Sequence, residues 1–131
     1  MVREMSDAFF ILILMILGHL IADYSLQGWL AQAKQKSYWE QYDKKYQADY
    51  IPALMCHATM WGIMIFIPLV WFDIDYVSGW VWLTLPINIA IHYVVDDLKA
   101  NKKIINLWQD QLLHFIQILT TWLFWLFVYW L

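Results

Sequence analysis

The chain has 131 residues, of which 63% are hydrophobic, 19% are aromatic and only 15% are charged. Soluble globular proteins carry about 25% charged residues, and a soluble domain of this length could not bury so much apolar surface. The composition therefore places the chain in a membrane, as a single domain over residues 1–131. The net charge of -3, without a dense basic patch, argues against nucleic-acid binding.

The first apolar segment runs from Ala8 to Ala22 and ends in polar residues. We expect a retained transmembrane helix reaching roughly Leu30, because the segment has neither a basic leader nor an A-x-A cleavage site. The apolar run is shorter than the ~20 residues that a bilayer requires. His19 and Asp23 must therefore lie within the span.

Between Ala31 and Tyr50 the chain is polar, with a tyrosine at every fourth position from Tyr38 onward. This spacing predicts a short amphipathic helix that lies in the membrane interface, between the first and second spans. The alternative is a tyrosine-rich soluble loop.

Three further apolar segments complete the expected architecture. The second span is expected over Ile51–Phe72 and the third over Val81–Val95, with a short acidic connection, Asp73–Gly79, between them. A basic linker, Ala100–Ile105, leads to a fourth span that begins near Leu107 and runs to the end of the chain. The predicted fold is therefore all-α, a polytopic membrane protein with four transmembrane helices.

The basic residues are distributed unevenly over the connections. Of the 8 Lys and Arg residues, only Arg3 precedes the first span. The others fall on the first and third connections: Lys34, Lys36, Lys44, Lys45, Lys99, Lys102 and Lys103. The positive-inside rule places these connections in the cytoplasm and both termini outside it. We expect a bacterial inner-membrane location.

Each expected span carries one histidine near its cytoplasmic end, and three of the four have an aspartate four residues away. The pairs are His19 with Asp23, His92 with Asp96, and Asp110 with His114, while His57 stands alone. Residues four apart share one face of a helix. Ionisable groups inside a bilayer cost at least ~2.5–3.5 kcal/mol each unless they are paired. We therefore expect these side chains to face one another.

Imidazoles and carboxylates in one polar pocket favour a divalent metal ion, zinc first, with manganese or iron as alternatives. The predicted ligands are His19, Asp23, His57, His92, Asp96, Asp110 and His114. One ion with an outer shell of partners and two bridged ions would both use this set. The alternative is a structural cluster of interhelical hydrogen bonds without a metal.

The chain resembles a family of small integral-membrane proteins of bacteria and phages that share a domain of unknown function. The resemblance covers essentially the whole chain. It rests on HLIADYSLQ (His19–Gln27) followed by Lys34, a histidine at His57, HYVVDDLK (His92–Lys99) and DQLLH (Asp110–His114). It implies a common polar site and no particular activity. The chain is more loosely similar to membrane-bound metal-dependent hydrolases, but it lacks their H-R and T-H-S motifs.

The favoured function is a metal-dependent hydrolase whose site opens to the cytoplasm. Metal-bound water would be the nucleophile, and Asp96 or Asp110 would act as general base. Lys99 would contact an anionic substrate. A phosphoester or a lipid headgroup is the expected substrate, because the site would lie at headgroup depth.

Other classes of function stay open, and so does the question of whether the chain is an enzyme. The same cluster would suit a transporter or sensor of a divalent cation or a proton, although the outer halves of the spans are apolar. A b-type haem protein is disfavoured by the carboxylates beside three of the histidines. The chain could also form a homo-oligomer.

Overall fold

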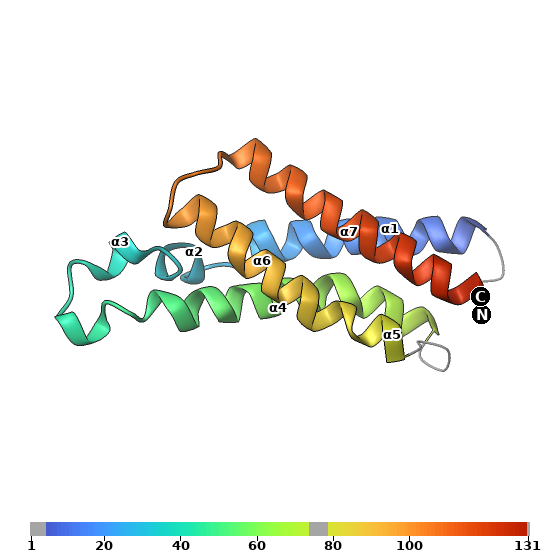
Figure 1. Ribbon diagram of the computed structural model, residues 1–131, viewed down its shortest axis with the longest axis horizontal. Coiled ribbons are helices and arrows are strands. Elements are labelled where there is room, and N and C mark those ends of the chain that lie inside the picture. The colour runs from blue at the N-terminus through green and yellow to red at the C-terminus, as the bar shows by residue number, and fades with distance from the viewer. Residues whose placement is uncertain (1–4, 74–78, 131) are drawn as a thin grey trace.

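The computed structural model of the chain describes residues 5–73 and 79–130, and over these residues it has helices and no strands. The long helices are α1 (Met5–Leu20), α4 (Tyr50–Asp73), α6 (Thr84–Ala100) and α7 (Leu107–Trp130). Each packs against two of the others, α1 and α6 both against α4 and α7. Figure 1 shows an up-and-down bundle in which the start of α1 and the end of α7 lie at the same end. The predicted all-α class is confirmed.

Within the described residues, three helical segments are long and apolar enough to cross a membrane: Met5–Ser25, Lys44–Trp71 and Leu107–Tyr129. They correspond to the first, second and fourth expected spans. At the place of the third, a short helix α5 (Gly79–Trp82) is followed by α6, whose 17 residues are fewer than the ~20 that a bilayer requires. Residues 74–78, the middle of the expected acidic connection, lie outside the described residues.

The first helix ends before the expected Leu30. After α1 the chain continues as a wider π-helical turn, Ile21–Ser25. Gly28 then adopts a φ of 46°, a left-handed conformation that glycine takes without steric cost, and the chain turns toward α2 (Leu30–Ala33). The π-helical turn carries Asp23, and such turns are frequent at functional sites.

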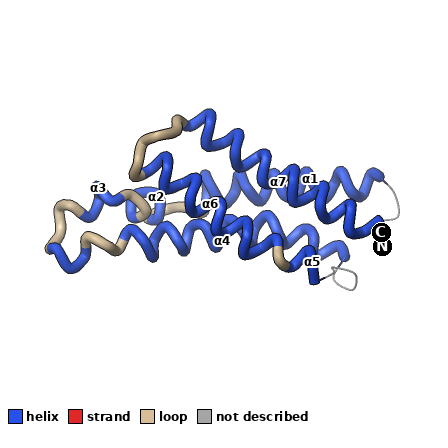
Figure 2. The backbone as a smooth tube through the Cα atoms, viewed as in Figure 1, coloured by secondary structure: helices blue, strands red, loops and turns tan. Residues whose placement is uncertain are grey.

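The single interfacial helix expected between Ala31 and Tyr50 is not one continuous helix. The segment contains α2, a second short helix α3 (Lys36–Trp39) and a 3₁₀ turn, Lys44–Tyr46, which are separated by loops in Figure 2. Its aromatic side chains still gather, with Tyr38 and Tyr42 ring centroids 5.8 Å apart.

Contacts with the end of α6 and with nearby aromatic rings hold this segment in short turns. The Asn101 side chain accepts a hydrogen bond from Lys36 N at 2.7 Å and donates one to Lys34 O at 3.2 Å. The Trp39 indole donates to Ala33 O at 2.7 Å. A continuous helix would use these backbone groups in its own hydrogen bonds, so the tertiary contacts replace it.

Two glycines allow α1 and α6 to approach α4 closely. A Cβ atom at Gly18 would lie 2.5 Å from the carbonyl oxygen of Met64 on α4. A Cβ atom at Gly62 would lie 2.5 Å from the side chain of Ile89 on α6. Small residues allow such close helix packing in membranes. Because Gly18 immediately precedes His19, the first contact also sets the distance from that histidine to α4.

The interior of the bundle is divided into an apolar half and a polar half. The apolar half lies toward the start of α1 and the end of α7. Its buried side chains include Ala8, Ile11, Met15, Ile65, Leu69, Ile118, Trp122 and Trp125. The polar half lies at the opposite end, beside α2 and the α6–α7 connection (Figure 1), and it contains the histidines and aspartates described next.

Candidate metal centre

The structure brings all four histidines and their three aspartates into one group, which we call the polar cluster. Its members are His19, Asp23, His57, His92, Asp96, Asp110 and His114, none more than 7% exposed. The π-helical turn and the four long helices each supply members. The ring centroids of His57 and His92 lie 5.1 Å apart, and those of His92 and His114 lie 4.2 Å apart.

Four donor atoms converge around His57 and form a first donor group. The Nε2 atoms of His57 and His92 lie 3.2 Å apart. His57 Nε2 also lies 3.3 Å from Asp23 Oδ1 and 3.1 Å from Asp96 Oδ2. Ligands bound to zinc at ~2.0–2.1 Å in a tetrahedral arrangement are ~3.3–3.4 Å apart. The distances to His57 Nε2 therefore resemble those between ligands of one ion, and the donor atoms of Asp23, His57 and His92 all lie within 4.8 Å of one another. The two oxygens lie farther from His92 Nε2, at 3.8 and 3.9 Å.

A second donor group surrounds His114 Nε2. Asp110 Oδ1 lies 3.4 Å from this nitrogen, Asp96 Oδ1 lies 3.5 Å from it, and Asp23 Oδ2 lies 3.9 Å from it. His92, Asp96 and His114 also offer donor atoms that all lie within 4.8 Å of one another. The polar cluster thus has ligand atoms for metal on both sides of the Asp23 and Asp96 carboxylates.

Several buried atoms of the polar cluster lack a hydrogen bond. Among the described residues, no partner is found for Asp23 Oδ1, His92 Nδ1, Asp110 Oδ1 or His114 Nε2. Leaving a buried polar atom unpaired costs about 1–3 kcal/mol. All but His92 Nδ1 belong to the two donor groups, where a bound cation would satisfy them. The donor chemistry and the unpaired atoms both fit a metal ion.

His19 has contacts that distinguish it from the other three histidines. Its Nδ1 lies 2.8 Å from the indole Nε1 of Trp61, and its Nε2 lies 3.1 Å from Gln111 Oε1. Because an indole N–H can only donate, Nδ1 accepts that bond and Nε2–H donates to Gln111. Both ring nitrogens are then occupied. These contacts favour a positioning role for His19 over the metal-ligand role expected from the sequence.

Two lysines reach the polar cluster from its edge. Lys34 Nζ donates to Asp96 Oδ2 at 2.6 Å, and its side chain is 7% exposed. Helical spacing does not predict this contact, because the two residues are 62 positions apart in the sequence. Lys99 Nζ pairs with Asp110 Oδ2 and is 28% exposed. The expected anion contact therefore lies where the polar cluster approaches solvent.

A chain of polar side chains, missed in the sequence, continues from the polar cluster toward the apolar half. His114 Nδ1 lies 3.4 Å from Gln117 Oε1, and Gln117 Nε2 donates to Asn88 Oδ1 at 3.1 Å. Asn88 Nδ2 then donates to Thr121 Oγ1 at 2.8 Å. Helical spacing could have indicated both amides, because Asn88 precedes His92 by four residues and Gln117 follows His114 by three.

The packing of the rings does not favour a haem. His92 stacks on His114 with an interplanar angle of 28°, and Trp61 stacks on His92 with centroids 4.2 Å apart. A haem with two axial histidines needs a flat slot between them. These stacked rings fill the space that such a slot would require.

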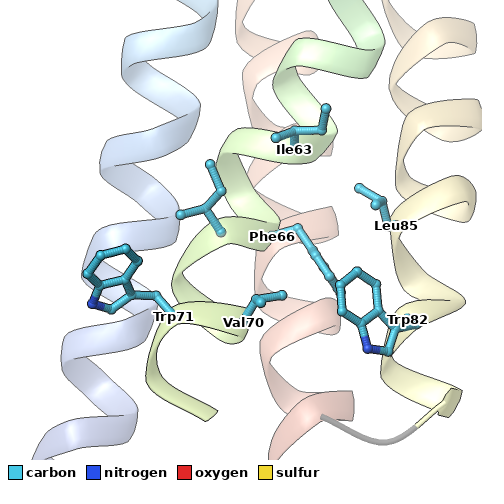
Figure 3. A pocket seen from close by; sticks show the side chains of 7 residues that line it. Ile63, Phe66, Val70, Trp71, Trp82 and Leu85 are labelled. Carbon is cyan, nitrogen blue, oxygen red and sulfur yellow. The ribbon is translucent and has the colours of Figure 1, made fainter. Parts of the chain in front are cut away.

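A groove of about 560 Å³ lies elsewhere, between α4 and the α5–α6 segment (Figure 3). Its lining side chains are Ile63, Phe66, Ile67, Val70, Trp71, Trp82 and Leu85. None of them can titrate or bind a divalent metal. The groove is therefore suited to apolar contacts.

Comparison with known proteins identifies a family. The sequence model of a family described as "Protein of unknown function (DUF3307)" matches residues 11–130. The match includes every residue of the polar cluster. No curated protein and no solved structure matches the chain.

Proposed function

The chain belongs to the DUF3307 family of proteins of unknown function, and we propose that it is a membrane-embedded, metal-dependent hydrolase. The observation that carries the proposal is the convergence of Asp23, His57, His92 and Asp96 at 3.1–3.3 Å around His57 Nε2. Unpaired donor atoms in a buried site support a cation there. Zinc suits this mixture of imidazole and carboxylate ligands, and manganese and iron are the alternatives.

The direction of the helices supports a fourth crossing by α6. The end of α4 and the start of α7 lie at opposite ends of the bundle in Figure 1. If α4 and α7 both cross the bilayer, the α5–α6 segment must return across the same thickness. The charge of Asp96, which argues against a span by composition alone, faces the polar cluster and Lys34 rather than lipid.

The lysines support an orientation with both termini outside the cytoplasm. All seven lie in the α2–α4 connection, in the last turn of α6 or in the loop that follows it, at one end of the bundle (Figure 1). The positive-inside rule assigns that end to the cytoplasm. A reporter active only in the cytoplasm should be silent after Leu131 and active when inserted after Lys103. The reverse pattern would overturn the orientation.

The proposed chemistry uses metal-activated water. A Zn²⁺ held by Asp23, His57, His92 and Asp96 would supply water activated for attack at neutral pH. With a single ion bound, Asp110 Oδ1, which is buried and has no hydrogen bond, would accept a proton as general base. Lys99 is placed to contact an anionic group, because it lies at the exposed edge of the polar cluster.

The proposed substrate is a phosphoester or the headgroup of a lipid. The polar cluster lies toward the lysine-bearing end of the bundle, which in this orientation meets the cytoplasmic headgroup layer. Of the two lysines that pair with aspartates of the polar cluster, Lys99 is the more exposed, so an anionic group entering the cluster would meet it before Lys34. The remaining apolar half of the bundle would anchor the site at that depth.

Metal content and hydrolysis should be measured together on protein purified in mild detergent. We expect bound zinc in the wild type and hydrolysis of p-nitrophenyl phosphate or a phospholipid. Both should be lost in His57→Ala and retained in Asp97→Asn, whose carboxylate contacts Asn101 and Lys102 outside the polar cluster. Folded wild type without stoichiometric metal would refute the site. Metal binding without hydrolysis of either substrate would refute the enzyme.

Transport of a cation or proton is a second candidate, favoured by the chain of polar contacts from His114 to Thr121. Beyond that chain, the buried indoles of Trp122 and Trp125 fill the apolar half, which argues against a continuous path. Proteoliposomes loaded with a zinc-sensitive dye would test the candidate. We expect no protein-dependent zinc entry, and rapid entry would favour transport.

A further inference from the structure

We infer that the polar cluster holds two divalent ions, bridged by the carboxylates of Asp23 and Asp96. The inference rests on the proposed metal site and adds a second ion to it. The first ion lies in the donor group around His57, and the second lies in the donor group around His114.

Each bridging carboxylate presents one oxygen to each donor group. Asp96 Oδ2 lies 3.1 Å from His57 Nε2, whereas Asp96 Oδ1 lies 3.5 Å from His114 Nε2. Asp23 follows the same pattern, with Oδ1 at 3.3 Å from His57 Nε2 and Oδ2 at 3.9 Å from His114 Nε2. Two carboxylates divided in this way between the same two imidazoles form the framework of a bridged pair of ions.

A single ion would leave part of the polar cluster unsatisfied. An ion in the first donor group would take its protein ligands from Asp23, His57, His92 and Asp96. His114 Nε2 and Asp110 Oδ1, which lie 3.4 Å apart, have no hydrogen bond in the structure and would gain no ligand contact from that ion. That separation is the one expected for two ligands of a common ion. A second ion would satisfy both atoms.

The charges of the polar cluster indicate the class of ligand that two ions would accept. Three aspartates and the paired Lys34 and Lys99 leave one negative charge when the imidazoles are neutral. Two divalent ions turn this into an excess of three positive charges. A metal-bound hydroxide and a phosphate dianion would balance that excess. Paired ions are also the arrangement that phosphatases and nucleases use to hold a phosphoryl group, so a phosphate-bearing ligand fits best.

Manganese provides a direct test, because two neighbouring Mn²⁺ ions are magnetically coupled and an isolated ion is not. Purified full-length protein should be loaded with Mn²⁺, freed of excess metal, and examined by elemental analysis and electron paramagnetic resonance. We expect about two ions per chain with a coupled spectrum, as in two-metal sites. His114→Ala and the isosteric Asp110→Asn should each retain about one ion, with an isolated six-line spectrum. Asp97→Asn should match the wild type.

The outcomes separate this inference from the proposed function. One isolated ion in the wild type, unchanged by His114→Ala or Asp110→Asn, would overturn the two-ion centre and leave the single-metal hydrolase standing. No bound Mn²⁺ in wild-type protein that is helical by circular dichroism and elutes as one symmetric peak would overturn both. Two ions that remain coupled in both variants would also overturn the assignment of the second ion to His114 and Asp110.

Discussion

Replacing Gly18 with alanine tests whether the contact between α1 and α4 sets the geometry of the polar cluster. The new Cβ would lie 2.5 Å from the carbonyl oxygen of Met64, an atom of the helix backbone that cannot rotate away. Relieving this clash to an ordinary contact of ~3.4 Å requires the two helices to separate by about 0.9 Å. Overpacking of this kind costs about 1–3 kcal/mol of stability.

The same displacement should weaken metal binding. The chain of α1 and its π-helical turn carries Asp23, and α4 carries His57, whose Nε2 lies 3.3 Å from Asp23 Oδ1. Metal sites tolerate ligand displacements of only about 0.5 Å. We therefore expect Gly18→Ala to lower zinc affinity by roughly 10–100-fold, the range measured when a supporting contact of a metal site is lost.

Two other glycines provide graded controls. At Gly62 the added Cβ meets Cγ1 of Ile89, a side-chain atom rather than a backbone atom, so Gly62→Ala should be destabilising but less so than Gly18→Ala. At Gly79 a Cβ would meet nothing within 4 Å among the described residues, so Gly79→Ala should be neutral. Thermal unfolding followed by circular dichroism and competition with a zinc-binding dye would measure stability and affinity. Equal values for Gly18→Ala and Gly79→Ala would refute the reasoning.

Three further predictions concern the polar cluster. Lys34→Met should lower the free energy of unfolding by about 3–5 kcal/mol, because it leaves the Asp96 carboxylate buried without its ammonium partner. As a control, Lys36→Met, at an exposed position, should change this free energy little. Equal denaturation midpoints for the two variants would contradict the Lys34–Asp96 pairing. The apparent affinity for zinc should fall as the pH is lowered from about 8 to about 5, because protons compete with the metal for the imidazoles; a pH-independent dissociation constant measured by equilibrium dialysis over this range would argue against imidazole ligation. Trp61→Phe keeps an aromatic ring beside the histidines but removes the hydrogen-bond donor to His19, so it should lower the free energy of unfolding by about 1–3 kcal/mol. An unchanged melting temperature would argue against the hydrogen bond between Trp61 and His19.

The sequence alone determines the features that depend on local spacing. An apolar composition with few charges requires long buried or lipid-facing helices, and α4 and α7 begin within one residue of where the hydrophobic pattern places them. The pairs His19–Asp23, His92–Asp96 and Asp110–His114 are close because residues four apart share a helix face. The cost of burying charge in a bilayer then predicts that the pairs should meet, and in the structure they do.

Only the tertiary structure decides how the members of the polar cluster divide their roles. His19 resembles the other histidines in its spacing, but the indole of Trp61, on another helix, donates to its Nδ1, and Gln111 accepts a hydrogen bond from its Nε2. Lys34 reaches Asp96 only because α2 folds back onto the bundle. In the same segment, the hydrogen bond from the Asn101 side chain to Lys34 O helps to replace the expected interfacial helix with short turns. Hydrophobic periodicity reports which face of a helix is buried. It does not report which neighbour that face meets or at what distance, because those depend on close packing at positions such as Gly18 and on hydrogen bonds between segments far apart in the chain.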